Sequence, residues 1–341
     1  MQGYDRLKSP CCSARVRSHS TFDIPMIALD DIRKSFRGRI ALSEPMARYT
    51  TFRIGGVADI YLEPLDKEDA LALITYLRRE SVPYVLMGNG SNILVSDQGI
   101  RGAVVNLEVG FNYARIEPDS TIVAGAGIKL AKFVDFCIGN GYAGAEMLAG
   151  IPGTLGGAVI MNAGAYGGEI SDHMLAVQLI RGSKLMTIAK DDAGFAYRTS
   201  SLQGDVILEA SFRFPSGQKE NMKVARREMM TKRNRSQPVQ WGNAGSIFKN
   251  PKGDFAARLI QECGLKGTTV GGAQISELHA NFIINLGQAT AADVMALIQI
   301  ARQAVFEKFA VELELEVKLI GEWGGGNRGS GVGDRESGGG D

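Results

Sequence analysis

The sequence has few of the residues that build metal centres and disulfide frameworks. It contains four cysteines, with no CxxC pair among them, and only three histidines. Neither a zinc site nor a disulfide-stabilised fold is indicated. We therefore expect no metal, and this low use of cysteine is typical of a protein from a reducing compartment.

An excess of charge of either sign is also missing. The chain has 38 basic and 37 acidic side chains, so it lacks the basic surplus with which proteins attract a nucleic-acid backbone. No apolar core of signal-peptide length occurs near the N-terminus. We expect a cytoplasmic protein with no nucleic-acid partner and no membrane partner.

One uncharged stretch, residues 147–168, is long enough to suggest a membrane helix. Its Pro152, its Asn162 and its many glycines weaken a helix. Glu146 and Glu169 flank it, where a membrane boundary would have basic and aromatic residues. We reject a membrane span here.

The same region, residues 149–169, is the most informative part of the chain because it combines many glycines with a proline and an asparagine. A glycine inside a helix costs ~1 kcal/mol relative to alanine, so such a run favours a backbone that something approaches closely. Main-chain N–H groups without a neighbouring Cβ suit a diphosphate or a flat conjugated ring. An ordinary glycine-rich connector on the surface is the alternative.

Alternation and spacing predict a βαβ unit that leads into a second glycine loop. Residues 58–62 alternate like a strand, Asp66 can cap a helix that ends before Pro83, and residues 84–87 form a second strand. The loop 88–92 follows directly. Further strands are expected at 103–107 and 121–124, with a helix from about 130 to 138.

The residue pattern of the chain changes near Gly217, where we place a boundary between two domains. Beyond it the pattern predicts helices at 224–235, at 254–263 and from Thr290 onward, with strands at 281–285 and 313–319. The two domains span 26–217 and 218–323. The glycine-rich tail 324–341 has almost no apolar side chain to bury and is expected to be disordered. Residues 1–25 are polar and irregular, and we expect them to be a disordered extension, with a wrongly assigned start as the alternative.

The familiar nucleotide-binding motifs do not occur. No GxxxxGK[ST] sequence is present, and Gly125-Ala-Gly127 lacks the third glycine of GxGxxG. Instead, several short motifs together resemble the bacterial UDP-N-acetylenolpyruvoylglucosamine reductase family, over Tyr49 to Trp323. These motifs are residues 88–92, Gly150-Ile-Pro-Gly153, Gly156-Gly157, Met161-Asn-Ala-Gly-Ala-Tyr166, Tyr197-Arg-Thr-Ser200 and Ala244-Gly-Ser-Ile-Phe-Lys-Asn-Pro251.

The resemblance implies an α+β fold. An FAD-binding domain of two subdomains, of the vanillyl-alcohol-oxidase (PCMH) type, would occupy 26–217, and a smaller C-terminal α+β substrate domain would occupy 218–323. It also implies non-covalent FAD, NADPH as co-substrate, an enolpyruvyl UDP-sugar as substrate, a role in peptidoglycan precursor synthesis and a monomer. The cofactor performs the hydride chemistry while the protein positions it and manages charge.

Three residues carry the reaction by this resemblance. Hydride addition to the enolpyruvyl group leaves a carbanion beside a carboxylate, and this charge must be stabilised and then protonated. Arg198 and a protonated Glu316 would stabilise it, and Ser246 would donate the proton. From the residues alone, Arg198 could be a surface side chain, Ser246 a turn residue and Glu316 a solvated glutamate.

Glu316 is preferred over Glu314 because the family's glutamate directly precedes a Val-Lys or Val-Arg pair. The family's Glu-Pro-Glu reads Glu314-Leu315-Glu316 here, which puts the local geometry in doubt. The short interval from Arg198 to Ser246 is similar to the family's second form, which lacks a tyrosine-bearing substrate loop.

The remaining implied contacts fall into two groups. Cofactor contacts are implied for Arg53, Gly88, Asn89, Gly90, Ser91, Asn92, Gly125, Gly150, Ile151, Pro152, Gly153, Gly156, Asn162 and Ala165. Substrate contacts are implied for Tyr197, Arg233, Gln237, Lys249 and Asn250, and Lys232 and Pro238 match the same basic segment, although a solvated basic helix is the alternative for Lys232.

Two rival functions stay open. One is another non-covalent FAD oxidoreductase of the same superfamily; no histidine lies between Ser20 and Asp172, so a covalent flavin linkage through a histidine there is excluded. The other is a non-catalytic UDP-sugar binder. The joint presence of Arg198, Ser246 and Glu316 argues against it.

Overall fold

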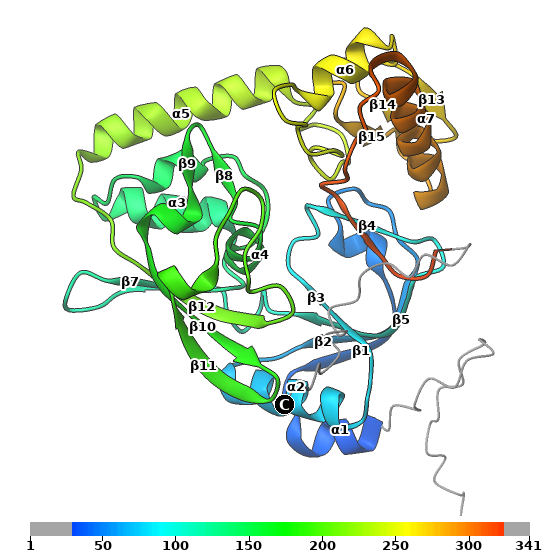
Figure 1. The fold of residues 1–341 in the computed structure, drawn as a ribbon. Helices are drawn as coiled ribbons and strands as arrows, with labels where there is room; N and C mark the ends of the chain where they lie inside the picture. Colours follow the sequence, from blue (N-terminus) through cyan, green and yellow to red (C-terminus); the bar gives the residue numbers. More distant parts are fainter. Residues whose placement is uncertain (1–28, 324–341) are drawn as a thin grey trace, which may run out of the picture.

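The computed structural model describes residues 29–323. The expectations for 1–25 and 324–341 therefore lie outside the described residues. Figure 1 shows one lobe at the lower centre and right, a second lobe on the left, a helical C-terminal lobe at the upper right and one long helix along the top. No helix within 29–323 is both long and apolar enough to cross a membrane.

The first lobe contains a four-stranded sheet in the order β1-β2-β5-β3. β1 is antiparallel to β2, while β2 and β3 both run parallel to β5, so the predicted βαβ unit has β5 between its two strands. Asp66 caps α2 by accepting from the N–H of Asp69, as its position before the apolar periodicity predicts. The elements are α1 (Leu29–Ser35), β1 (Arg39–Pro45), η1 (Met46–Tyr49), β2 (Val57–Glu63), α2 (Lys67–Arg79), β3 (Tyr84–Met87), β4 (Ile93–Val95) and β5 (Ile100–Asn106).

The second lobe contains a five-stranded antiparallel sheet in the order β11-β10-β12-β7-β6. Helix α3 packs on it through Phe133, whose ring centroid lies 5.0 Å from that of Phe212. The elements are β6 (Ala114–Ile116), β7 (Ile122–Gly125), α3 (Leu130–Gly139), η2 (Ala145–Leu148), α4 (Leu155–Ile160), β8 (Gly164–Ala165), β9 (Gly168–Glu169), η3 (Ile170–His173), β10 (Met174–Arg181), β11 (Lys184–Ala189), η4 (Lys190–Ala193) and β12 (Val206–Phe212).

The C-terminal lobe packs helices α6 and α7 against a small three-stranded sheet, β13-β14-β15. The predicted capping box at the start of α7 is present between Thr290 and Asp293. Asp97 of the first lobe also accepts from the N–H groups of Ala291 and Ala292. The elements are α5 (Lys219–Ser236), α6 (Ala256–Glu262), β13 (Thr269–Val270), β14 (Ala273–Ile275), β15 (Ile283–Asn285), α7 (Ala291–Phe309) and β16 (Lys318–Ile320).

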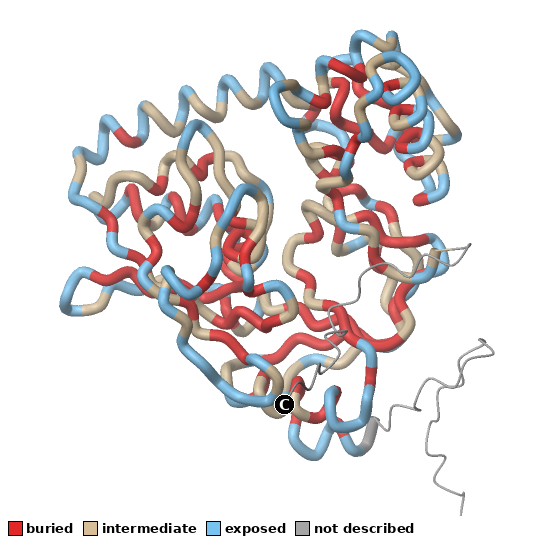
Figure 2. The backbone as a smooth tube through the Cα atoms, viewed as in Figure 1, coloured by how far each residue is buried: buried red, intermediate tan, exposed pale blue. Residues whose placement is uncertain are grey.

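The predicted boundary near residue 217 falls between β12 and α5, and the division into domains stays a prediction. Two features connect the lobes across it. Phe52, Ile54 and Leu94 of the first lobe are buried in the same apolar core as α6 and α7. The final strand, β16, returns to pair in parallel with β4, and Figure 2 shows buried residues interspersed with exposed ones along the segment that leads to it.

Several local predictions need correction. The strand expected at 313–319 is regular only over β16, because residues 314 and 315 pair individually with Lys249 and Phe248. The burial alternation nevertheless holds, since Leu313 and Val317 are buried while Glu314 is exposed. Part of the glycine run, Leu155–Ile160, forms helix α4. The strands β10, β11 and β12 were not predicted.

Candidate active site

The glycine loop 88–92 leaves the carboxyl end of β3 with main-chain N–H groups available to a ligand. Within residues 29–323, the N–H groups of Asn89, Gly90 and Ser91 have no protein acceptor. Gly90 has φ +59°, and a Cβ on it would lie 2.2 Å from the carbonyl oxygen of Tyr49. Only glycine fits this position, and successive free N–H groups form a concave anion-binding surface.

Ser91 and Asn92 tie this loop to the other two lobes. The Ser91 hydroxyl donates to the carbonyl of Pro152 at 3.0 Å, and Gly153 lies opposite the same hydroxyl, where a Cβ would be 2.9 Å away. Asn92 donates through its side-chain amide to the carbonyl of Glu316 at 3.1 Å. The structure thus brings three predicted segments, 88–92, 150–153 and the Glu316 segment, to one place.

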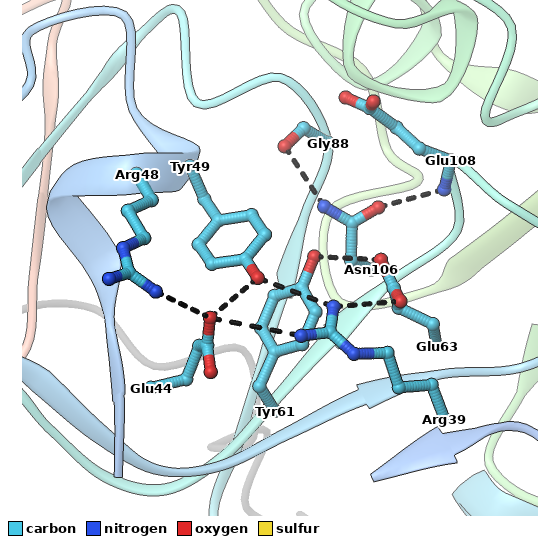
Figure 3. A network of polar contacts seen from close by, with 9 residues as sticks. All are labelled: Arg39, Glu44, Arg48, Tyr49, Tyr61, Glu63, Gly88, Asn106 and Glu108. Atoms are coloured by element: carbon cyan, nitrogen blue, oxygen red, sulfur yellow. Dashed lines mark hydrogen bonds and ion pairs between the residues drawn. The ribbon is translucent and has the colours of Figure 1, made fainter. Parts of the chain in front are cut away.

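A cavity of about 560 Å³ opens beside the loop, between Gly88 and Asn89 on one side and the end of β5 on the other. Asn106 crosses this end by donating to the carbonyl of Gly88 and accepting from the N–H of Glu108 (Figure 3). Burial raises the pKa of the Glu108 carboxyl, and the charge of Lys129 opposes that rise. Asn106 was not predicted as a site residue, although a polar residue at the carboxyl end of a buried strand is a signal for a ligand site.

Two stacked tyrosines border the same cavity. The ring centroids of Tyr49 and Tyr61 are 4.3 Å apart, and Figure 3 shows the carboxylates of Glu44 and Glu63 beside their hydroxyl groups. The Tyr49 hydroxyl donates to Glu44 at 2.8 Å, and that of Tyr61 donates to Glu63 at 3.2 Å. Desolvation raises the pKa of Tyr61, so its phenol stays protonated. Tyr49, Tyr61 and Glu63 therefore give this side of the cavity a polar surface.

Arg233 of α5 lies against the predicted glycine segment. A Cβ on Gly150, where φ is +82°, would lie 2.8 Å from Cδ of Arg233, so glycine is what allows this approach. Burial lowers the pKa of Arg233, and the guanidinium has no ion-pair partner in the described part of the chain. Gln237, one turn later, has a buried side-chain oxygen without a partner. A half-buried cation and a free amide oxygen are features of a ligand site.

Two predicted cofactor glycines have packing reasons of their own. A Cβ on Gly125 would lie 2.3 Å from the carbonyl oxygen of Phe111, and one on Gly156 would lie 2.9 Å from Cβ of Ala126. The N–H of Gly156 donates to the carbonyl of Ala126. These close contacts within the chain are sufficient to explain why both positions are glycine. Contact of Gly125 and Gly156 with a cofactor stays a prediction.

Asn162 connects the glycine run to the turn that carries Arg198. It is buried with φ +43°, and its amide donates to Glu169 at 2.6 Å and to the carbonyl of Ala196 at 3.2 Å. Its side-chain oxygen is buried without a partner. Ala196 and Thr199 close the turn by exchanging two main-chain hydrogen bonds. Asn162 therefore fixes the base of the turn while leaving one acceptor open.

Within that turn Arg198 reaches Glu316. Its φ is +57°, its Nη2 donates to the carbonyl of Gly164 at 3.0 Å, and its Nε lies 3.3 Å from Oε1 of Glu316. Burial raises the pKa of Glu316, while the positive charges of Arg198 and Lys249 oppose the rise. The raised pKa shows that burial outweighs both cations.

Glu314 has a different environment from Glu316. Its side chain is 71% exposed, compared with 19% for Glu316, and it pairs with the amine of Lys249. Among the two glutamates, only Glu316 has the desolvated position that favours a neutral carboxyl group. The geometry therefore agrees with the preference for Glu316.

Ser246 is half-buried and immediately precedes Ile247, whose carbonyl accepts from the N–H of Glu316 at 2.9 Å. The Ser246 hydroxyl has no hydrogen-bond partner within residues 29–323. Asn250, further along, accepts through its side-chain oxygen from the N–H of Ala256 and so helps to begin α6. The Ser246 hydroxyl is thus free to bond to a ligand, and the residue that follows it is bonded to the main chain of Glu316.

The other predicted residues are placed as follows. Tyr197 is 59% exposed and its ring lies 5.1 Å from the guanidinium carbon of Arg198. Arg53 is exposed with φ +57°. Ile151 is half-buried and donates its N–H to the carbonyl of Leu148, Pro152 is exposed, and Ala165 pairs with Gly168 in the β8–β9 hairpin.

Two family models match the chain. Residues 58–184 match a model described as an FAD binding domain, and residues 237–320 match one described as the C-terminal domain of UDP-N-acetylenolpyruvoylglucosamine reductase. The matches confirm the predicted fold class, an α+β protein in which an FAD-binding domain precedes a smaller C-terminal domain.

Similar proteins cover nearly the whole chain. A UDP-N-acetylenolpyruvoylglucosamine reductase from Chloroherpeton thalassium is 43% identical over 305 residues, which are 87% of this chain and 98% of that protein. One from Symbiobacterium thermophilum, named reductase 2, is 42% identical over 83% of this chain and 93% of its own. The crystal structure of the reductase from Thermus caldophilus has a TM-score of 0.71 at 36% identity and covers 83% of this chain and 98% of its own. The chain is an FAD-containing oxidoreductase and belongs to the UDP-N-acetylenolpyruvoylglucosamine reductase family.

Proposed function

We propose that the protein reduces the enolpyruvyl ether of UDP-N-acetylglucosamine to UDP-N-acetylmuramate with NADPH, for peptidoglycan precursor synthesis. The reaction adds one hydride and one proton across the carbon–carbon double bond, and NADPH becomes NADP⁺. The observation that carries the proposal is the contact between Arg198 and Glu316, whose main-chain N–H is bonded to Ile247, the residue after Ser246.

The residues of the chain fit FAD. The free N–H groups of Asn89, Gly90 and Ser91 suit its diphosphate, and the open side-chain oxygen of Asn162 suits a ring N–H. When bound, FAD supplies the hydride-transfer chemistry between the nicotinamide and the substrate. Gly150 and Gly153, at φ +82° and +128°, allow Arg233 and Ser91 to approach the backbone of the segment that is proposed to line the cofactor site.

Arg198 and Glu316 stabilise the charge that develops on the substrate. Hydride addition at the terminal carbon leaves negative charge shared between the next carbon and the carboxylate. The planar, permanently charged guanidinium of Arg198 binds that carboxylate. Glu316, whose pKa burial raises, donates a hydrogen bond in its protonated form to the same group.

Ser246 completes the reaction by protonating the carbon next to the carboxylate. Its hydroxyl is free within the described residues, and its neighbour Ile247 is bonded to the Glu316 main chain. A carbanion is basic enough to accept a proton from an alcohol, whose own ordinary acidity is low. The serine oxygen then regains a proton from solvent.

Arg233, Gln237, Lys249 and Tyr197 are proposed to bind the substrate. The half-buried guanidinium of Arg233 has no ion-pair partner in the described chain, which suits an anionic diphosphate or carboxylate. Lys249 now pairs with Glu314 and contributes positive potential at Glu316. Asn250 has its side-chain oxygen in use, so only its amide hydrogens remain for a ligand.

Anaerobic rapid mixing of the flavin-loaded protein tests the proposal. NADPH should bleach the flavin, and the enolpyruvyl UDP-sugar should restore its absorbance with formation of the lactyl ether. Ser246→Ala should leave bleaching nearly intact and slow restoration by about 10²-fold. Failure of the enolpyruvyl substrate to reoxidise the flavin, or equal loss of both half-reactions in Ser246→Ala, would contradict the proposal.

A further inference from the structure

Asn281 holds the main chain of Phe248 from both sides. Its side-chain carbonyl accepts from the N–H of Phe248 at 2.9 Å, and its side-chain amide donates to the carbonyl of Phe248 at 2.8 Å. The main-chain carbonyl of Asn281 also accepts from the N–H of Ile247 at 2.9 Å. Three hydrogen bonds from one residue therefore fix the two residues that follow Ser246.

On the side away from Asn281, residues 247–249 are hydrogen-bonded to residues 314–316. The carbonyl of Ile247 accepts from the N–H of Glu316 at 2.9 Å, and the N–H of Lys249 donates to the carbonyl of Glu314 at 2.8 Å. Residues 247–249 are thus held between Asn281 on one side and residues 314–316 on the other. The register of Ser246 relative to Glu316 depends on both sets of bonds.

Asn281 is outside the β ladder that follows it. The sequence predicts a strand at 281–285, whereas β15 begins at Ile283. Asn281 is 3% exposed and Phe248 is 2% exposed. Removal of the asparagine amide would leave the main-chain groups of Phe248 without water or protein partners, so the segment would have to move to satisfy them.

We infer that Asn281 is a positioning residue that sets the Ser246 hydroxyl at its reacting distance by fixing Ile247 and Phe248. The inference rests on the proposed function, because it gives Ser246 the role of proton donor. Displacement of a reacting group by about 1 Å can cost about 10²-fold in rate. The effect should therefore fall on substrate protonation and leave the NADPH step unaffected.

The test compares Asn281→Ala with Asn285→Ala in the flavin-loaded protein. Asn285 is a buried asparagine of the same lobe whose side chain also makes three main-chain hydrogen bonds, to Phe52, Gly287 and Ala289, and none to the Ser246 segment. Both half-reactions are measured by anaerobic rapid mixing across a range of substrate concentrations, in H₂O and in D₂O.

We expect Asn281→Ala to slow the limiting rate of reoxidation by the enolpyruvyl UDP-sugar by roughly ten- to hundred-fold. Reduction by NADPH and the half-saturating substrate concentration should change little, and the solvent deuterium isotope effect on reoxidation should increase. Asn285→Ala should keep the wild-type ratio of the two rates. Equal loss of both half-reactions in Asn281→Ala, or a ratio and isotope effect like those of Asn285→Ala, would overturn the inference.

Asn281→Leu decides the question if the alanine variant does not fold. Leucine has the same branched shape as asparagine, but it neither accepts from the N–H of Phe248 nor donates to the Phe248 carbonyl. It should show the same selective slowing of reoxidation, and an unchanged ratio of rates would overturn the inference. Ser246→Ala, measured in parallel, separates the proposed role of Ser246 from the proposed role of Asn281. If Ser246→Ala slows reoxidation selectively and neither Asn281 variant does so, the positioning role of Asn281 fails while the proton-donor role of Ser246 stands.

Discussion

Arg198 and Glu316 meet across the active site, with Nε of the arginine 3.3 Å from Oε1 of the glutamate. The two side chains reach each other from a tight turn, closed by Ala196 and Thr199, and from the segment that precedes β16. The contact joins a permanent cation to a carboxyl group whose pKa is raised by burial. Such a pair can hold a proton and a positive charge side by side, as an anionic substrate requires.

Glu316→Gln should therefore damage the enzyme much more than Glu314→Gln. Glutamine keeps the shape of Glu316 but cannot adopt the ionised form that balances Arg198 when substrate is absent. It also donates a weaker hydrogen bond than a carboxylic acid does. We expect a loss of about 10²-fold in the rate of flavin reoxidation for Glu316→Gln.

Glu314→Gln is the matched control because Glu314 is largely exposed and bonded to Lys249. Glu314→Gln should change the rate of flavin reoxidation by no more than about three-fold. The measurement is the reoxidation rate with saturating enolpyruvyl substrate. Similar losses in the two variants would show that the buried position of Glu316 has no special role.

The rate of reoxidation should fall as pH rises through the pKa of Glu316. Burial places this pKa above the ordinary glutamate value, although Arg198 and Lys249 oppose the shift. The active form is the protonated one, so activity is full below the raised pKa and is lost above it. The alkaline fall should be absent from the residual activity of Glu316→Gln.

The same shift affects stability with a definite sign. A carboxyl group whose pKa is higher in the folded state binds its proton more tightly there than in the unfolded chain. Its contribution is fully present below the unfolded pKa and is lost as pH rises through the folded pKa. Glu316→Gln should remove this part of the pH dependence of the unfolding free energy, measured in urea at several pH values.

Gly90→Ala should weaken flavin binding as well as stability. The residue has φ +59°, and an added Cβ would lie 2.2 Å from the Tyr49 carbonyl oxygen. Strain from the left-handed backbone alone costs about 1–2 kcal/mol. The clash adds to this and displaces the loop whose free N–H groups are proposed to bind the cofactor. The free energy of unfolding and the flavin dissociation constant measure the two effects.

Gly264→Ala provides the control for backbone strain. Gly264 has φ +72°, and nothing lies within 4 Å of the position of its Cβ. It should lose only the strain energy and bind flavin like the wild type. If the two alanine variants were equally stable and bound flavin equally well, the close approach of Tyr49 to Gly90 would have no energetic consequence.

The local elements with strong sequence signals could be predicted. Helix α7 begins where Thr290 and Asp293 form a capping box, and α2 begins after Asp66. Both signals are contained within one turn of chain. Strand β12 was missed because it pairs with β10 and with the distant β7, and no local pattern records that register. Strands β10 and β11 form a hairpin closed by Gly182 and Ser183, a local turn signal that the prediction did not use.

The site was predictable as a set of residues but not as an arrangement. The resemblance indicated Arg198, Ser246 and Glu316 as residues. The contact between Arg198 and Glu316 depends on the turn that carries Arg198 and on the return of the chain before β16, which no local pattern records. Contact of Asn162 with the cofactor stays a prediction, while the hydrogen bond from its amide to the carbonyl of Ala196 in the arginine turn had no sequence signal. Asn281 gave no signal, because its importance depends on hydrogen bonds to the distant main chain of Phe248.

The pairing of β4 with β16 has a consequence for the biogenesis of the protein. Within residues 29–323, β4 pairs only with β16, and the carbonyl of Asn92 accepts from the N–H of Lys318. The ribosome makes the cofactor loop early and makes this supporting strand near the end of the described chain. Because folding during translation proceeds from the N-terminus, we expect the loop to reach its final form only after the last strand emerges. We therefore expect a nascent chain that lacks β16 to bind flavin more weakly than a chain that includes it.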